Sequence, residues 1–120
     1  MVAACAQAGI PVYVVPGPTA ALSALVLSGL PTGRFTFEGF LSVNKRGRKE
    51  HLEAVRGETR TMIFYEAPHK LRKTLSDFSK VYGPERKIAL CRELTKLHEE
   101  VWRTTVWEAA AHYREQEPRG

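Results

Sequence analysis

The chain has 120 residues, of which 43% are hydrophobic and 26% are charged, and its net charge is +5. This length allows a single domain with a core of its own, and the composition is ordinary for a globular protein. No apolar run approaches the roughly 20 residues of a membrane span, and the first residues lack the basic start of a secretory signal. We therefore expect a cytoplasmic protein without a membrane partner. Its basic character points weakly toward a polyanionic partner.

The cysteines and histidines show no metal-binding pattern. Cys5 and Cys91 form no C-x-x-C pair, and no two of the four histidines are spaced as i, i+4. We therefore expect reduced, buried thiols and no metal site.

In chain order, apolar periodicity predicts alternating helices and strands over a single domain of residues 1–120. The predicted helices are a short one that ends near Gly9, then about 18–29, 47–56, 68–82 and 108–115, and the predicted strands are 12–16, 35–40, 60–65, 87–92 and 98–107. Strands that alternate with helices of about a dozen residues are typical of the α/β class. We expect a mixed, partly parallel β-sheet flanked by helices.

The first candidate site follows the apolar run Val12–Val15. That run enters the segment Pro16-Gly17-Pro18-Thr19-Ala20, which opens the helix predicted at 18–29. Gly17 lets a ligand approach the backbone closely, and the free N–H groups of the first helical turn attract an anionic group such as a carboxylate. An ordinary connection between a strand and a helix explains the same residues.

Two further strand ends carry polar side chains. Tyr65 and Glu66 follow one strand, and a segment with Arg92, Glu93 and Lys96 follows another. The carboxyl ends of parallel strands meet at one edge of a sheet, so these groups are expected to line a ligand crevice. The alternatives are an acid that interacts with a helix N-terminus for Glu66 and a solvated ion pair for Arg92 and Glu93.

A cluster of cations lies between 44 and 49. Lys45, Arg46, Arg48 and Lys49 fall in a loop that leads into the helix predicted from residue 47. Cations at a helix N-terminus oppose the helix dipole, which suggests a bound anion such as the phosphates of a nucleic acid. A solvated, mobile loop is the competing interpretation.

Four stretches resemble a known family. They are VPGPTAALSALVLSGLPTGRFTFEGFL, KRGRKEHL, TMIFYEAPHKLRKTL and RKIALCRELTKLHEE. From about residue 2 to 115 the chain resembles the C-terminal half of the ribosomal RNA small subunit methyltransferase I (RsmI) family, within the tetrapyrrole (corrin/porphyrin) methylase superfamily. The PGPTA motif is shared across the superfamily, whereas FYE-x-PH-[KR]-L and RELTK are specific to this group.

The resemblance implies a homodimeric, two-domain class III methyltransferase that binds S-adenosylmethionine between its domains. Such an enzyme methylates the ribose 2′-hydroxyl of a cytidine in 16S (small-subunit) ribosomal RNA. This chain corresponds to the C-terminal domain, without the N-terminal domain and the last strand. The isolated chain is therefore expected to be inactive.

Carried onto this sequence, the resemblance assigns roles to the strand ends. The cofactor-binding positions are Pro16, Gly17, Thr19, Ala20, Tyr65 and Leu94. A ribose hydroxyl needs a base, and the carboxylates at the expected crevice are Glu66, which we favour, and Glu93. Arg92 completes the catalytic candidates. The RNA-binding candidates are Lys45, Arg46, Arg48, Lys49 and Lys96.

Two other functions remain open. A methyltransferase of a tetrapyrrole (a corrin or porphyrin precursor) would also place Arg and Lys around its cleft, because that substrate carries many carboxylates. A non-catalytic RNA-binding or dimerisation module would share the basic segment and would lack affinity for S-adenosylmethionine.

Overall fold

The computed structural model describes residues 1–14, 19–92, 94 and 99–118. Its elements are α1 (Val2–Gln7), α2 (Ala20–Leu27), β1 (Phe35–Phe40), α3 (Lys45–Val55), β2 (Thr61–Tyr65), the 3₁₀ helix η1 (Pro68–Lys70), α4 (Leu71–Tyr82), β3 (Lys87–Arg92), β4 (Glu100–Thr105) and α5 (Val106–Glu115). The predicted α/β class, with parallel pairing and flanking helices, is confirmed.

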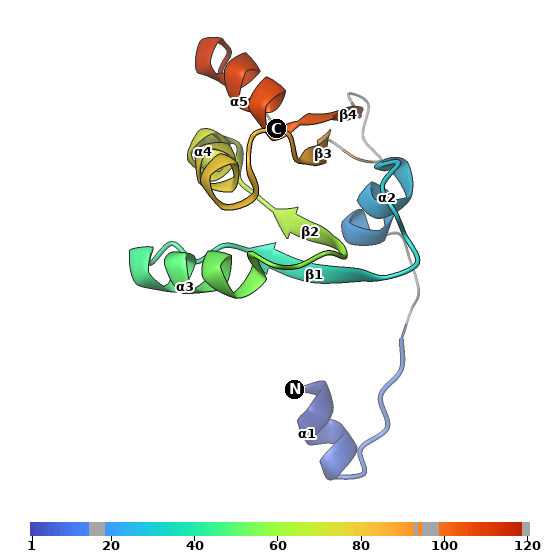
Figure 1. Ribbon diagram of the computed structural model, residues 1–120. Coiled ribbons are helices and arrows are strands. Elements are labelled where there is room, and N and C mark those ends of the chain that lie inside the picture. Colours follow the sequence, from blue (N-terminus) through green and yellow to red (C-terminus); the bar gives the residue numbers. More distant parts are fainter. Residues whose placement is uncertain (15–18, 93, 95–98, 119–120) are drawn as a thin grey trace.

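The four strands form two separate pairs. β1 pairs with β2 in parallel, across the crossover helix α3, and β3 pairs with β4 in antiparallel fashion. The strands succeed one another in the order β1, β2, β3, β4 through one layer (Figure 1). The mixed pairing agrees with the prediction, but the single predicted sheet is divided, because β2 and β3 belong to different two-stranded sheets.

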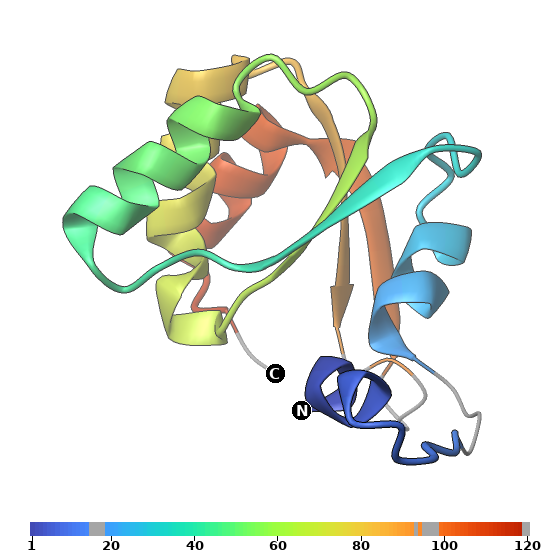
Figure 2. The same cartoon turned by 90° about the horizontal axis from the view of Figure 1, so that it is seen from below.

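Helices cover both faces of the strand layer. Helices α3, α4 and α5 lie on one side of it and α2 lies on the other (Figure 2). The most deeply buried large side chains are Leu75 of α4, 1% exposed, and Val106 of α5, which is fully buried. Arg103 of β4 ties α2 to the strands by donating from Nη2 to the carbonyl of Leu27 at 2.7 Å. The most deeply buried part of the core therefore lies between the strands and the α4–α5 side, and Leu25 of α2, 4% exposed, extends it to the other face.

A β-bulge in β1 determines which side chains share a face. The register with β2 shifts between Phe37 and Gly39, and Gly39 has a φ of +67°. Because of the extra residue, Phe37 and Phe40 both point to the face of Tyr65. The Tyr65 ring lies 5.3 Å from that of Phe37 and 5.6 Å from that of Phe40.

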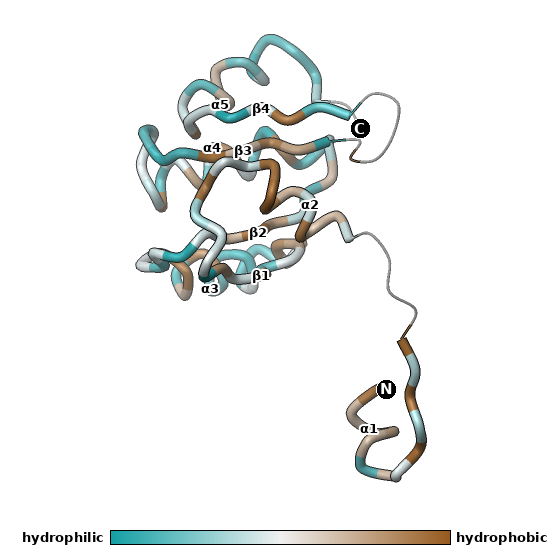
Figure 3. The backbone as a smooth tube through the Cα atoms, turned by 90° about the vertical axis from the view of Figure 1, so that its right-hand side faces the viewer, coloured by the Kyte–Doolittle hydropathy of each residue, from teal (hydrophilic) through white to brown (hydrophobic). Residues whose placement is uncertain are grey.

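The strand predicted at 12–16 is wrong over its described part. Val12, Tyr13 and Val14 adopt no strand, and they are 47%, 90% and 81% exposed. A strand needs a neighbouring edge for its backbone hydrogen bonds, and this segment stands away from the body of the molecule (Figure 3). Residues 15 and 16 lie outside the described part of the chain.

Helix α3 begins two residues earlier than predicted. The side chain of Asn44 accepts hydrogen bonds from the backbone N–H groups of Arg46 and Gly47, at 2.9 and 3.2 Å. This N-cap places Lys45 and Arg46 in the first helical turn, so the prediction of a basic loop is wrong for these two residues.

At the other end of the domain, the predicted strand 98–107 extends too far. β4 ends at Thr105, whose hydroxyl oxygen accepts a hydrogen bond from the backbone N–H of Glu108 at 3.2 Å. Trp107 therefore belongs to α5.

Candidate functional site

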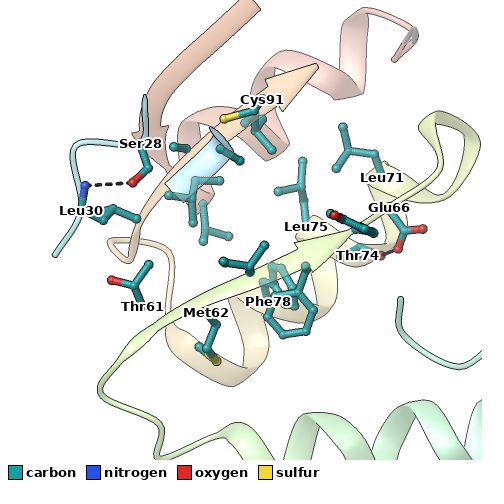
Figure 4. Close-up of a pocket in the computed structure, with 18 of the residues that line it drawn as sticks. Ser28, Leu30, Thr61, Met62, Glu66, Leu71, Thr74, Leu75, Phe78 and Cys91 are labelled. Atoms are coloured by element: carbon teal, nitrogen blue, oxygen red, sulfur yellow. Dashed lines mark hydrogen bonds between the residues drawn. The ribbon is translucent and has the colours of Figure 1, made fainter. Parts of the chain in front are cut away.

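A cavity of about 850 Å³ lies between β2 and β3, with α2 and α4 contributing to its walls (Figure 4). Every residue of β2 and every residue of β3 lines it. Successive side chains of a strand point to opposite faces, so the cavity is bordered by the facing edges of the two strands. Its volume falls within the range of sites for small organic molecules.

The cavity brings together predicted residues from three parts of the chain. Those that line it are Ala20, Tyr65, Glu66, Arg92 and Leu94. β2 and β3 run in the same direction, and α2 starts at the end where both strands finish (Figure 2). The predicted convergence therefore holds for these five positions.

Of the remaining candidates at the strand ends, Thr19 is described by the structure, and it does not line this cavity. Thr19 is the exposed N-cap of α2, and its side chain makes no capping hydrogen bond. The predicted cofactor residues Pro16 and Gly17 lie outside the described residues, as do Glu93 and Lys96.

Glu66 is held in place directly after β2. Its Oε1 accepts a hydrogen bond from the N–H of Ala67 at 2.9 Å, and its Oε2 accepts one from the hydroxyl of Thr74 at 2.6 Å. Thr74 lies on α4 and is 2% exposed. The carboxylate of this cavity-lining residue is thus fixed by one donor from the connection after β2 and one from α4 (Figure 4).

Arg48 is a core residue, and its predicted role in RNA binding is wrong. Its Nε donates to Oδ2 of Asp77 at 2.8 Å and its Nη2 to the hydroxyl oxygen of Thr74 at 2.8 Å. The residue is only 9% exposed. The buried Leu52 lies four positions later, so both residues are on the face of α3 that packs inward. The guanidinium is therefore unavailable to a phosphate.

The other three cations of this segment are exposed. We define the basic surface as Lys45, Arg46 and Lys49, in the first turns of α3. Arg46 pairs with Glu50 at 3.1 Å, but both side chains are largely in water, so this pair contributes little to stability. α3 follows β1 after a short loop, which places the basic surface at the end of the layer where β1 and β2 finish.

Arg92 is positioned by the antiparallel pair. It lies opposite Glu100 in the β3–β4 register, and its Nε donates to the carboxylate of Glu100 at 3.1 Å. Both residues line the cavity. The guanidinium is therefore held at the cavity wall, partly neutralised by its partner.

The pKa values of two groups, Glu38 and Cys91, are shifted by their surroundings. A hydrogen bond from His51, at 2.8 Å between Nε2 and Oε1, lowers the pKa of Glu38 and joins α3 to β1. Burial raises the pKa of the Cys91 thiol, which also lines the cavity. Cys91 is therefore a neutral wall residue at neutral pH rather than a thiolate nucleophile.

No cluster of three or more His, Cys, Asp or Glu side chains able to hold a metal ion is found among the described residues. Within the same residues, no helix is both long enough and apolar enough to cross a membrane.

A family profile and individual relatives both match this chain along most of its length. The profile of the Tetrapyrrole (Corrin/Porphyrin) Methylases matches residues 1–110. A protein of Synechocystis sp. named Ribosomal RNA small subunit methyltransferase I is 49% identical over 120 residues, which are 100% of this chain and 43% of that protein.

Proteins with the same name from Escherichia coli O157:H7 and Thermotoga maritima are 44% and 41% identical, over 99% and 100% of this chain. The chain spans only 42% and 53% of their respective lengths. The profile match extends over most of the sequence, from α1 into α5. The chain belongs to the tetrapyrrole (corrin/porphyrin) methylase family.

Proposed function

We propose that this chain is the C-terminal domain of an S-adenosylmethionine-dependent methyltransferase acting on small-subunit ribosomal RNA. The reaction is methylation of the ribose 2′-hydroxyl of a cytidine, in a two-domain, homodimeric, cytoplasmic enzyme. The observation that carries the proposal is the cavity between β2 and β3, with the fixed Glu66 at its wall and the basic surface at the same end of the layer as Glu66. The names of the curated relatives support the choice of RNA as substrate.

The cavity is compatible with S-adenosylmethionine in size and in chemistry. Its walls include Leu25, Ile63 and Leu75, which suit the apolar faces of an adenosine, and the Glu66 carboxylate suits a cationic sulfonium. Ala20, Tyr65 and Leu94 would hold the cofactor from three sides. When bound, S-adenosylmethionine supplies an electrophilic methyl group.

Glu66 is suited to accept the proton of the ribose hydroxyl. A hydroxyl is a weak nucleophile until its proton is being removed, and a carboxylate within hydrogen-bond reach can serve as the base. Each oxygen of Glu66 accepts one protein hydrogen bond, and each still has acceptor capacity.

The basic surface is suited to contact the RNA backbone beside the target nucleotide. Extruding a nucleotide costs a few kcal/mol, and less where the RNA is already single-stranded. Lys45, Arg46 and Lys49 offset this cost by neutralising phosphates. Lys96 remains a proposed further contact, whereas Arg92 at the cavity wall would approach the reacting nucleotide.

A methyl-transfer assay distinguishes the three candidate functions. Full-length protein is supplied with radiolabelled S-adenosylmethionine and with small ribosomal subunits, naked ribosomal RNA or a porphyrinogen. We expect label in the RNA, at a cytidine whose 3′ linkage resists alkaline hydrolysis. Label only in the porphyrinogen would identify a tetrapyrrole methyltransferase. Salt-dependent RNA binding without label or cofactor binding would identify a non-catalytic module.

Replacing Lys45, Arg46 and Lys49 together with alanine is expected to weaken RNA binding while the affinity for S-adenosylmethionine stays unchanged. Loss of three phosphate contacts should lower the slope of log K against log salt by about 2 to 3. Filter binding at several salt concentrations measures this slope.

The matched control removes three exposed cations, Arg56, Arg60 and Lys80, from the opposite end of the layer. It lowers the net charge by the same amount and should leave the salt slope nearly unchanged. Equal losses in both triple variants would mean that total charge, and not the basic surface, determines RNA binding.

A further inference from the structure

A chain of hydrogen bonds runs behind the cavity and joins α3, α4 and the end of β2. It passes from Asp77 to Arg48, then to Thr74 and finally to Glu66, with donor–acceptor distances of 2.8, 2.8 and 2.6 Å. The two partners of Arg48 lie 29 and 26 positions later in the sequence. The chain therefore depends on the packed arrangement of these elements.

The direction of these hydrogen bonds is fixed by the chemistry of arginine. A guanidinium carries only donors, so the hydroxyl oxygen of Thr74 must accept from Arg48. Thr74 has a single hydroxyl proton, which is thereby directed to Oε2 of Glu66. Asp77 accepts a hydrogen bond from Nε of the same guanidinium and so restrains its rotation.

Burial makes this arrangement difficult to replace. Thr74 is 2% exposed and Arg48 is 9% exposed, so water has little access to the groups that orient Glu66. Glu66 is itself one of the residues that line the cavity. Glu66 is thus bound to the interior of the protein through Thr74, while the residue as a whole remains only partly buried.

We propose that Thr74, supported by Arg48, is a positioning residue that holds Glu66 in the orientation needed to accept the ribose proton. This inference rests on the proposed function. Thr74 and Arg48 act through Glu66 and not on the substrate. A carboxylate held in one orientation is effective because proton transfer depends on donor–acceptor geometry, and a displacement of about 1 Å can cost 100-fold in rate.

The principal test is Thr74→Val in the full-length protein, because valine keeps the shape of threonine and lacks the hydroxyl. We expect kcat for methyl transfer to small ribosomal subunits to fall about 10- to 100-fold. The KM for RNA and the Kd for S-adenosylmethionine should change less than about 2-fold. Thr74→Ser restores the hydroxyl and should recover most of kcat. In a crystal structure of the Thr74→Val variant, Glu66 should occupy more than one rotamer.

Thr104→Val is the matched control. Thr104 also donates a hydrogen bond to a glutamate, Oε2 of Glu108 at 2.7 Å, but neither residue lines the cavity. This variant should retain the wild-type kcat. If Thr74→Val does not fold, Arg48→Lys tests the same chain, because an ammonium cannot reproduce the guanidinium fork that contacts both partners. It should lower kcat, again without a comparable change in KM.

The outcomes separate this inference from the proposed function. Wild-type kcat in a folded Thr74→Val or Arg48→Lys variant would overturn the inference and leave the proposed function intact. Failure of serine to recover activity would also overturn it, since the hydroxyl would then not be the determinant. A wild-type protein that transfers no methyl group to RNA would instead overturn the proposed function.

Discussion

The Glu66→Gln variant of the full-length protein is expected to lose about 10²- to 10⁴-fold in kcat for methyl transfer to RNA. Glutamine has nearly the same size and its carbonyl oxygen can still accept the Thr74 hydroxyl, but it cannot take up a proton. The KM for RNA should change little, because the loss concerns the transition state. Single-turnover assays with saturating cofactor measure the chemical step.

Glu53→Gln is the appropriate comparison for this variant. Glu53 is an exposed carboxylate of α3 that accepts a hydrogen bond from Arg56, and it does not line the cavity. It should keep full activity. If the kcat of Glu66→Gln also stays within about 2-fold of the wild-type value, the role of Glu66 would be structural. Glu93 would then become the candidate base.

Leu75→Ala is expected to lower the free energy of unfolding by about 3 kcal/mol. Leu75 lies in the middle of α4 and is 1% exposed, so its truncation removes buried apolar surface and leaves a void in the core. Urea denaturation followed by circular dichroism measures the change.

Leu22→Ala provides the corresponding control in α2. Leu22 is 49% exposed, and alanine favours a helix, so the same substitution should cost less than about 1 kcal/mol there. Comparable losses at both positions would contradict the location of the core described above.

Strong local signals explain which elements the sequence predicts well. β1 and β3 match their predicted bounds. Each is a short run of mainly apolar residues with turn residues or charged residues at its ends. The helical segment from Pro68 to Tyr82 also matches, since proline begins it and Gly83 follows it. These signals depend only on neighbouring residues, and the structure preserves them.

The burial of Arg48 is not predicted by the sequence, although the helix predicted from residue 47 already puts positions 48 and 52 on one face. A cationic side chain is expected in water unless buried partners are known. The partners of Arg48, which are Thr74 and Asp77 on α4, leave no local signal. Such contacts between distant segments cannot be derived from the spacing of residues alone.

At residues 12–14 the sequence predicts a strand that the structure does not form. Its apolar, β-branched composition indicates a strand, but strand formation depends on a neighbouring edge that composition cannot supply. In the described structure Tyr13 is 90% exposed. The division between β2 and β3 has the same cause, because pairing between strands is determined by tertiary packing and not by the individual runs.

The β-bulge at Gly39 in β1 determines the face of the strand layer on which the ring of Phe40 lies. A Cβ at Gly39 would meet the Phe37 ring at 3.5 Å, an ordinary contact, so the restriction at this position is the positive φ and not lack of space. Without the extra residue, Phe40 would turn toward Phe64 and His51, whose rings already fill the helix-covered side. Substitutions among aromatic residues at positions 37 and 40 should therefore be tolerated better than replacement of Gly39, whose conformation determines the face to which Phe40 points.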